Sequence, residues 1–447
     1  PTPFVLPSAV EPPAPTPTPD PEPEPVRLRY AMWDANQVPA YAACAEQFMA
    51  QHPHITLEIE QTEEALYWDK LAADMAAGTA PDVFVNHLMH LSDLAGAGQL
   101  LDLEPLVQRD HVDDKLYIGR LARMWMRAGV RYGWPKDWDT IALVYNRDLM
   151  NAAGVPTSSL NELTWNPIDG GAFETLLARL TVDGAGNNAL NPDFNPADVA
   201  SHGLTMAGND GGGAYGQTQW SGLAVSNGFR FTDFMFADYY HYDDPALSET
   251  LDWYQRLINE RGYHTPFDEV IARDGRQVFL DGEAALIADG SWMISTYVNE
   301  TPFAVGFAPL PSGPHGRKSM FNGLADSIWS SSANPEEAWT WVKHLGSVDC
   351  QLLVGEHGVV FPALQSGVER MLAHYDERGV DIRAYTEYLA ERSPGEPEST
   401  FLFPVTEQTM EVIAIMQPVI ESILDGTADP ASVLPVANER VNALFRD

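Results

Sequence analysis

Three tryptophans lie at the ends of predicted strands, and each has polar residues beside it. Trp33 ends the first predicted strand, Trp138 directly precedes a strongly apolar strand, and Trp292 follows a later one. The acids and amides beside the first two are Asp34, Asn36, Gln37, Asp137 and Asp139. Aromatic rings stack on the apolar C–H faces of sugars, and carboxylate and amide groups form hydrogen bonds with hydroxyls. One such tryptophan is more often a core residue, but three at the same topological position favour a binding site.

Other patterns that could carry chemistry are less informative. His87 and His90 could share a helix face and hold a metal, but no third ligand is near in the sequence, so hydrogen-bonding loop histidines are favoured. The run GGGAYG, Gly211–Gly216, matches G-x-G-x-x-G without a preceding strand, so a loop is favoured over dinucleotide binding. No G-x-S-x-G elbow or fixed carboxylate pair indicates hydrolysis. We therefore expect no catalytic residues, no metal and no cofactor.

Strands and helices alternate in the first part of the chain. Val26–Asp34, ITLEIEQ and PDVFVNHL read as strands, and the helices between them include one that ends at Gly78. This alternation predicts a parallel, doubly wound sheet, whose strand ends would gather the polar residues. After Leu143 the alternation starts again. Because single hydrophobic cores stop growing near about 250–300 residues, a chain of 447 residues predicts two α/β lobes.

The composition excludes one class of partner and leaves another question open. The net charge of −37, from 26 basic and 63 acidic residues, repels phosphate backbones, so no nucleic-acid partner is expected. Cys44 and Cys350 are the only cysteines, and the sequence is compatible with a disulfide or with two buried thiols. No apolar run approaches the roughly 20 residues that a transmembrane helix needs.

The first 25 residues differ from the rest of the chain. They are rich in Pro, Thr and acidic residues, which predicts a disordered, semi-rigid spacer. A spacer ahead of a folded body suggests a tether to a membrane surface. The simplest anchor is a lipid on a residue outside this chain.

Several segments, in order, resemble the extracellular solute-binding proteins of ABC importers, a family that includes maltose-binding protein and many oligosaccharide binders. The resemblance runs from about Val26 to the C-terminus. It is carried by GTAPDVFV, GWPKDWDTIALVYNRDLMNAAGVP, LTW, VFLDGEAALIADGSWM, VGFAPLPSG, NGLADSIWSSSANPEEAWTWVKHL and GVVFP. The evidence lies in the order and spacing of these segments, since none is specific alone.

The resemblance implies two doubly wound α/β lobes joined by a hinge, the type II periplasmic binding protein-like fold. The chain would cross between the lobes near Lys136–Ala142, Asn322–Ser327 and Val360–Leu364. The N-terminal lobe would hold residues 26–139 and 325–361, and the C-terminal lobe residues 140–324 and 362–447. Closure would occur by bending at the crossings.

The resemblance also implies which residues meet the ligand. The expected ligand-binding residues are Trp33, Asp34, Asn36, Gln37, Asn86, His87, Asp137, Trp138, Asp139, Trp220, Trp292, Asn322 and Phe403. Lys136 could also reach the ligand, but a structural pair with a neighbouring aspartate is favoured.

The expected function is a non-enzymatic, extracellular or periplasmic receptor. It would capture a mono- or oligosaccharide between its lobes and deliver it, as a monomer, to an ABC permease in the membrane. One alternative is a binding protein for a non-sugar ligand such as a polyamine, which an acidic cleft would suit. A less favoured alternative is a secreted polysaccharide-active enzyme.

Overall fold

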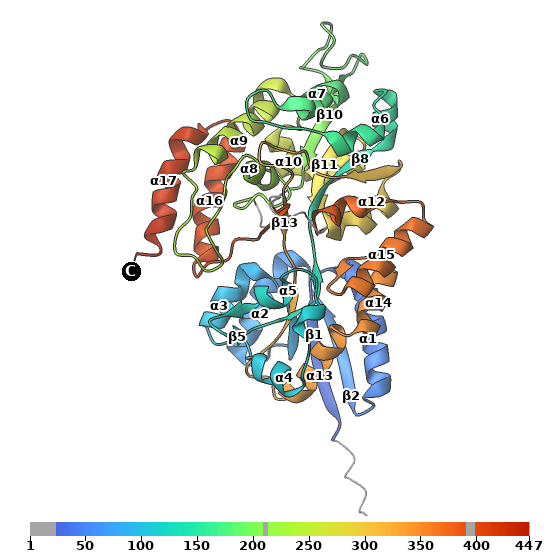
Figure 1. Ribbon diagram of the computed structural model, residues 1–447, viewed down its shortest axis with the longest axis vertical. Helices are drawn as coiled ribbons and strands as arrows, with labels where there is room; N and C mark the ends of the chain where they lie inside the picture. The colour runs from blue at the N-terminus through green and yellow to red at the C-terminus, as the bar shows by residue number, and fades with distance from the viewer. Residues whose placement is uncertain (1–23, 209–212, 390–397, 447) are drawn as a thin grey trace, which may run out of the picture.

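Two α/β lobes follow one another along the long axis of the molecule (Figure 1). The structure is a computed structural model, and it describes residues 24–208, 213–389 and 398–446. The predicted spacer therefore lies outside the described residues, apart from its last two positions. The N-terminal lobe is the one whose sheet contains the first strand of the chain, and the other is the C-terminal lobe.

The N-terminal lobe is built on a five-stranded sheet of order β2–β1–β3–β14–β6. Its strands are β1 (Val26–Met32), β2 (Ile55–Gln61), β3 (Val83–Asn86), β6 (Trp134–Pro135) and β14 (Ala325–Ile328). β1 pairs in parallel with β2 and β3, as the alternation of strands and helices predicts. β14 is antiparallel to β3, because it enters the sheet from the other lobe.

Helices cover this sheet and are visible in the lower half of Figure 1. They are α1 (Val38–Gln51), α2 (Glu64–Ala77), α3 (Leu91–Gly96), α4 (Glu104–Arg109), α5 (Leu121–Met124), α13 (Pro335–Leu345) and α14 (Val348–His357). α2 ends where the sequence predicts: Gly78 adopts a left-handed φ of 72° and its N–H bonds the carbonyl oxygens of the last turn.

The C-terminal lobe contains the second five-stranded sheet, of order β12–β8–β11–β10–β9. Its strands are β8 (Ile141–Asn146), β9 (Val182–Asp183), β10 (Val199–Met206), β11 (Ala284–Gly290) and β12 (Val305–Ala308). β10 and β11 are parallel, whereas β8 is antiparallel to both of its neighbours. Every residue of β8 is buried. A strand covered on both faces reads as a continuous apolar run, which explains the sequence IALVYN.

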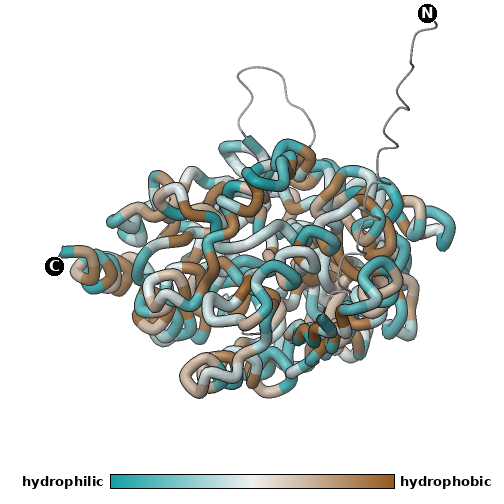
Figure 2. Tube along the Cα trace, turned by 90° about the horizontal axis from the view of Figure 1, so that it is seen from below, coloured by the Kyte–Doolittle hydropathy of each residue, from teal (hydrophilic) through white to brown (hydrophobic). Residues whose placement is uncertain are grey.

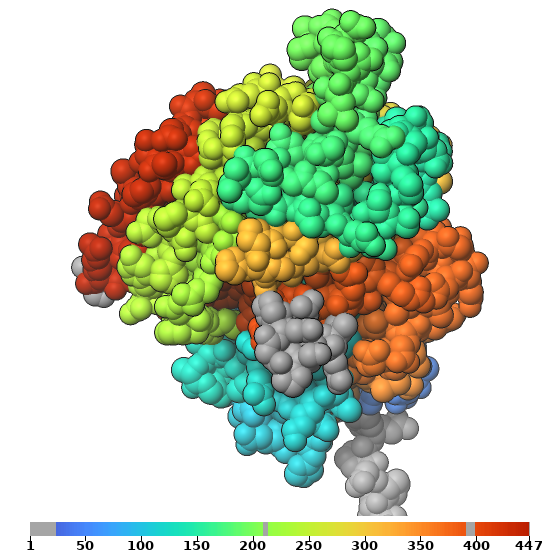
Figure 3. Space-filling model, turned by 45° about the horizontal axis from the view of Figure 1, so that its top comes forward, coloured from blue at the N-terminus to red at the C-terminus, as the bar shows by residue number. Residues whose placement is uncertain are grey.

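The helices of this lobe surround its sheet in the upper half of Figure 1. They are α6 (Arg147–Ala152), α7 (Gly171–Leu180), α8 (Ser221–Ser226), α9 (Pro245–Arg256), α10 (Phe267–Arg273), α11 (Gly275–Leu280), α12 (Ile294–Glu300), α16 (Thr409–Leu424) and α17 (Pro430–Ala443). α15 (Gln365–Glu377) follows the last crossing and packs against α14. Between β9 and β10, residues 184–198 project from the lobe (Figures 1 and 3).

Hydrophobic and hydrophilic positions alternate along the covering helices (Figure 2). In α9, for example, Leu247, Leu251 and Trp253 are buried while Ser248 and Asp252 are not. This spacing puts one face of the helix on the core and the other in water.

Short strands occupy the three segments in which crossings between the lobes are predicted. In the first, β6 continues through β7 (Asp137–Trp138) into β8. In the second, β13 (Ser319–Phe321) continues into β14, and in the third, β15 (Phe361–Pro362) pairs antiparallel with β7. A Cβ atom at Gly323 would lie 2.7 Å from the carbonyl oxygen of Asp137. The backbones of the first two crossings therefore approach each other so closely that only glycine fits at position 323.

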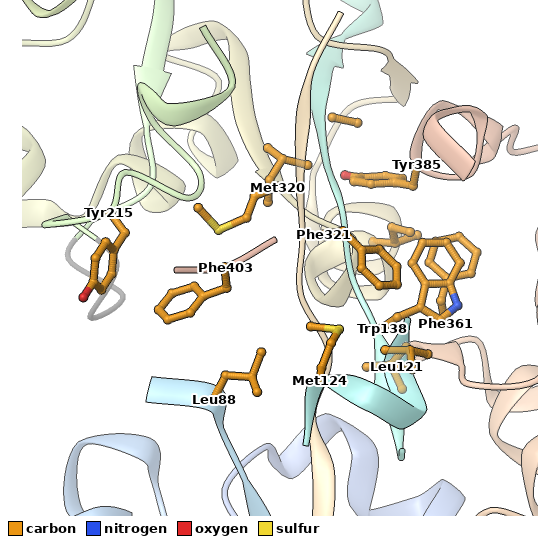
Figure 4. Packing of buried hydrophobic residues seen from close by; sticks show 14 of the residues in the cluster. Leu88, Leu121, Met124, Trp138, Tyr215, Met320, Phe321, Phe361, Tyr385 and Phe403 are labelled. Carbon is orange, nitrogen blue, oxygen red and sulfur yellow. The ribbon is translucent and has the colours of Figure 1, made fainter. Parts of the chain in front are cut away.

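Each crossing segment contributes one aromatic ring to a common cluster (Figure 4). Trp138 stacks on Phe361 with ring centroids 4.6 Å apart, and Phe321 lies 6.0 Å from the same indole. All three rings are buried. Offset and tilted pairs of this kind contribute about 0.5–1.5 kcal/mol each beyond the burial of their area. The three crossings are therefore packed together as one unit.

Cys44 of α1 and Cys350 of α14 form a disulfide. Their Cα atoms are 5.1 Å apart, although 306 positions separate them in the chain. The question left open by the sequence is thus settled in favour of a bond. Disulfides persist in oxidising compartments, which fits a protein outside the cytoplasm.

Candidate ligand-binding cleft

A cavity of about 370 Å³ lies between the lobes and is lined by residues of both. Ten of the thirteen residues that the sequence predicts for a ligand line it. They are Trp33, Asp34, Asn36, Gln37, His87, Asp137, Trp138, Asp139, Trp292 and Asn322. They meet there because β1, β3 and β11 end at this cleft and two of the crossings pass beneath it. Ligands of open α/β sheets bind at such strand ends.

The remaining three predicted residues do not line the cavity. Asn86 is fully buried beneath it and donates to Ser327 Oγ at 3.1 Å. Trp220 is fully buried, and its Nε1 donates to the carbonyl oxygen of Gly213. Phe403 is buried and packs on His87 and Tyr215. Phe403 and Trp220 thus contact lining residues, His87 and Gly213, from outside the cavity.

Aromatic rings approach the cavity from both lobes. Trp33, from the end of β1, is half-buried and packs against Tyr67 and Trp68 of α2 at centroid distances of 5.1 and 5.5 Å. Trp292 lies in a short helical turn, Ser291–Met293, that follows β11. Its ring folds back over Gly290: a Cβ atom there would lie 2.0 Å from the indole. Both rings keep an exposed part for a ligand face.

Buried polar atoms of the cavity lining lack partners within the described residues. They are Trp138 Nε1, Gln219 Oε1, Ser291 Oγ and one atom of the Asn322 amide. Asn322 is only 2% exposed. A buried polar atom without a hydrogen bond costs about 1–3 kcal/mol.

His87 is neutral in this cleft. Burial, with a smaller contribution from His90, lowers the pKa of His87 to about 3. Its Nδ1 accepts from the N–H of Met89 at 3.1 Å, so the single ring proton is on Nε2, 3.1 Å from the Asn322 amide. Nε2–H therefore donates to the oxygen of that amide, which fixes the amide orientation.

Asp139 lies at the first crossing and accepts from Gln217 Nε2 at 2.9 Å. Burial and the neighbouring carboxylate of Asp137 raise the pKa of Asp139 well above its ordinary value. Hydrogen bonds donated by a ligand would favour the ionised form. A ligand donor that reaches Asp139 would therefore lower its pKa again.

Lys136 does not line the cavity. Its Nζ donates to Asp137 Oδ2 at 2.8 Å and to Gln37 Oε1. The structural pair that the sequence favours is therefore present.

Several lining residues are not among the sequence predictions. Gln217, Thr218 and Gln219 come from the segment before α8, and Arg276 comes from the start of α11. The Arg276 guanidinium binds Asp289 through two nitrogens, at 2.7 and 2.9 Å. Gln61, Glu63, Glu64 and Ser291 also line the cavity. For Gln217, Thr218 and Gln219, the only indication in the sequence is that the run QTQW is polar. Nothing in the sequence places this run beside Asp139.

The weaker sequence motifs also have a place in the structure. His90 stacks on Trp68 at 3.7 Å. Within residues 24–208, 213–389 and 398–446, no group of three or more His, Cys, Asp or Glu side chains could hold a metal ion. The run GGGAYG begins outside the described residues, and its remainder, from Gly213, forms turns before α8.

Two α/β lobes with a cleft between them, lined by aromatic and polar side chains, are the architecture of a two-lobed solute-binding protein. Residues 34–351 match the family described as bacterial extracellular solute-binding protein. The chain belongs to this family. None of the described helices is long and apolar enough to cross a membrane.

Three individual proteins show how far the similarity extends. A putative binding protein of Brucella abortus is 24% identical and is aligned over 94% of this chain and 93% of its own. The maltodextrin-binding protein of Bacillus subtilis is 26% identical over 65% of this chain and 62% of its own. The crystal structure of UspC from M. tuberculosis, 26% identical, covers 93% of this chain and 99% of its own with a TM-score of 0.72.

Proposed function

We propose that this protein captures a neutral mono- or oligosaccharide between its lobes and delivers it to an ABC permease. The observation that carries the proposal is the composition of the cleft. Half-buried indoles of Trp33 and Trp292 line it from different lobes, together with carboxylate and amide side chains such as Asp34, Asn36 and Asn322. A sugar presents an apolar face and a hydroxyl edge, and it needs both kinds of group. The similarity to a maltodextrin-binding protein points the same way.

Binding would close the lobes by bending at the crossings. We take the lobes as residues 26–139 with 325–361 and residues 140–324 with 362–447. A ligand shifts the open–closed equilibrium only through its different affinity for the two states. Contacts with Trp33 on one lobe and Trp292 on the other exist together only when the lobes are near. The protein would act as a monomer, and the segment before Val26 would link it to a membrane anchor.

A thermal-shift panel of mono- and oligosaccharides tests the proposal. A sugar at about 100 times its dissociation constant stabilises the fold by about 2.7 kcal/mol. The same sugar should compact the protein in X-ray scattering, and Trp292→Ala should weaken its binding at least about tenfold. A panel in which no sugar raises the melting temperature would refute the assignment.

A polyamine is the second candidate ligand, because of the charges that line the cleft. The carboxylates of Asp34, Glu63 and Glu64 line it, whereas the charge of Arg276 is matched by Asp289. An ammonium ligand would gain from this excess of negative charge and from the indole faces. Spermidine belongs in the same panel. Stabilisation by spermidine but by no sugar would replace the sugar assignment.

A further inference from the structure

Lys136 is a buried cation whose contacts reach from the first crossing to the wall of the cleft. It is 1% exposed, and its Nζ lies 4.2 Å from the centroid of the buried Tyr41 ring. It donates to Asp137 on its own strand and to Gln37 on the loop that follows β1. Burial alone would lower the pKa of Lys136, but the carboxylate of Asp137 and other nearby groups outweigh it and raise the pKa. The ammonium form is thus maintained inside the protein.

The contact with Gln37 continues to the ligand side. Gln37 is 3% exposed, and its Nε2 donates to Asp34 Oδ2 at 2.9 Å. The other carboxylate oxygen of Asp34 accepts from the N–H of Asn36, also at 2.9 Å. Asp34, Asn36 and Gln37 all line the cavity. We call residues 34–37 the ligand loop. Lys136 orients the amide of Gln37, and Gln37 in turn orients the carboxylate of Asp34. The conformation of the ligand loop depends on this carboxylate.

The opposite side of Lys136 connects to the second crossing. Asp137 Oδ2 bonds the ammonium, while its Oδ1 accepts from the N–H of Leu324 at 3.1 Å. Leu324 directly precedes β14, the strand that returns to the N-terminal lobe. Hydrogen bonds with a charged partner are about twice as strong as neutral ones. The ligand loop and both crossings therefore share one buried cation.

We propose that Lys136 is a positioning residue for ligand binding, which holds the ligand loop in register with the crossing strands through Gln37. The inference rests on the proposed function, because it assigns the ligand loop to the binding surface. Lys136 itself touches no ligand. Its role is to keep Asp34 and Asn36 in the binding geometry before a ligand arrives, which reduces the ordering cost of binding.

Hydrogen exchange in the ligand-free protein tests the positioning directly. Lys136→Met should speed exchange at the Asn36 amide by about tenfold or more, since a charge-assisted bond is lost. Amides in the middle of β1 report global stability and should not change by the same factor. Lys318→Met is the matched control, because this buried lysine bonds the carbonyl oxygen of Glu398, outside the cavity lining.

A second variant covers the case in which Lys136→Met does not fold, since it leaves Asp137 without its cation. Gln37→Leu breaks the same connection while the Lys136–Asp137 pair remains. It should also speed exchange at Asn36 by about tenfold. Unchanged exchange at Asn36 in the folded variants would overturn the proposal, whatever ligand the protein binds.

A double-mutant cycle with maltotriose as the probe gives the functional readout. Lys136→Met and Asp34→Asn should each weaken binding, and the double variant should be little weaker than the worse single variant. Lys136→Met and Trp292→Ala should instead combine multiplicatively. Multiplicative effects in both cycles would show that Lys136 acts only on general stability and would overturn the proposal. If wild-type protein binds no maltotriose, maltotriose is not its ligand, and the exchange experiment alone decides the role of Lys136.

Discussion

At the scale of single residues, the position of Trp292 depends on the absence of a side chain two residues earlier. The indole ring lies where a Cβ atom of residue 290 would be, 2.0 Å from the nearest ring atom. Real Cβ contacts are never so short, so a side chain here must displace the ring. Gly290 therefore determines the direction in which Trp292 faces the cleft.

We expect Gly290→Ala to weaken sugar binding at least about tenfold, close to the effect of Trp292→Ala, because both remove the ring from its position. Titration calorimetry with the best sugar of the panel measures this. Gly96→Ala is the control, since no atom lies within 4 Å of a Cβ there. Wild-type affinity in Gly290→Ala would show that Trp292 does not contact the sugar.

The same scale shows what the sequence could and could not predict about the site. Trp33 and Asp34 could be predicted because they lie at the end of a strand that the sequence pattern identifies. The ends of parallel strands meet at one edge of the sheet. Arg276 and Gln217 were missed because they come from a helix start and an irregular segment, and tertiary packing alone brings them to the cleft. Trp220 shows the converse, since a tryptophan in a polar segment packs wholly into the core.

At the scale of elements, α1 and α14 are joined by both packing and a covalent bond. Cys44 and Cys350 are fully buried, and neither lines the cavity. Closing a long loop with a disulfide mainly restricts the unfolded chain. The bond therefore contributes to the stability of the N-terminal lobe without shaping the ligand contacts.

The variant Cys44→Ala/Cys350→Ala should lower the free energy of unfolding by about 2–5 kcal/mol, the usual cost of losing a native disulfide. Urea unfolding of the variant and the oxidised wild type measures the difference. Sugar affinity below the unfolding transition should stay within about twofold. Equal stability of the two proteins would mean that the bond adds nothing to the fold.

At the scale of the whole molecule, buried imidazoles link stability to pH. Burial lowers the pKa of His87 and of His264 to about 3 and that of His90 to about 4. These residues titrate near 6.5 in the unfolded chain. The unfolded state therefore binds more protons below pH 6.5, and each histidine makes the fold less stable as the pH falls toward its folded pKa. Asp326 acts in the opposite sense, because burial raises its pKa to about 7.

His264→Gln isolates one of these contributions. Between pH 6.5 and about 4, wild-type stability should fall more steeply than that of the variant, by up to about 1.4 kcal/mol per pH unit. Denaturant unfolding at several pH values gives both slopes. Parallel slopes for wild type and His264→Gln would mean that His264 is protonated in the folded protein.

The overall architecture was more predictable than the site, for a physical reason. The alternation of strands with helices such as α1 and α2 follows from short stretches of sequence, each of which can be read by itself. Two α/β lobes could therefore be expected. The antiparallel direction of β14 could not be predicted from its own residues, ADSI. Its direction depends on the segment that precedes it, which enters from the other lobe. The family resemblance, rather than periodicity, indicated where the crossings lie.

The place of β14 between β3 and β6 has a consequence for how the chain reaches its fold. The sheet of the first lobe to emerge during synthesis is completed late, because Val83 of β3 pairs with Ile328, which is made after all strands of the β8–β12 sheet. Contacts between residues so distant in sequence form slowly. Until Ala325–Ile328 arrives, the edge of β3 has no strand beside it. A nascent chain of this protein thus offers an open β-edge to a chaperone or an export machine for most of its synthesis.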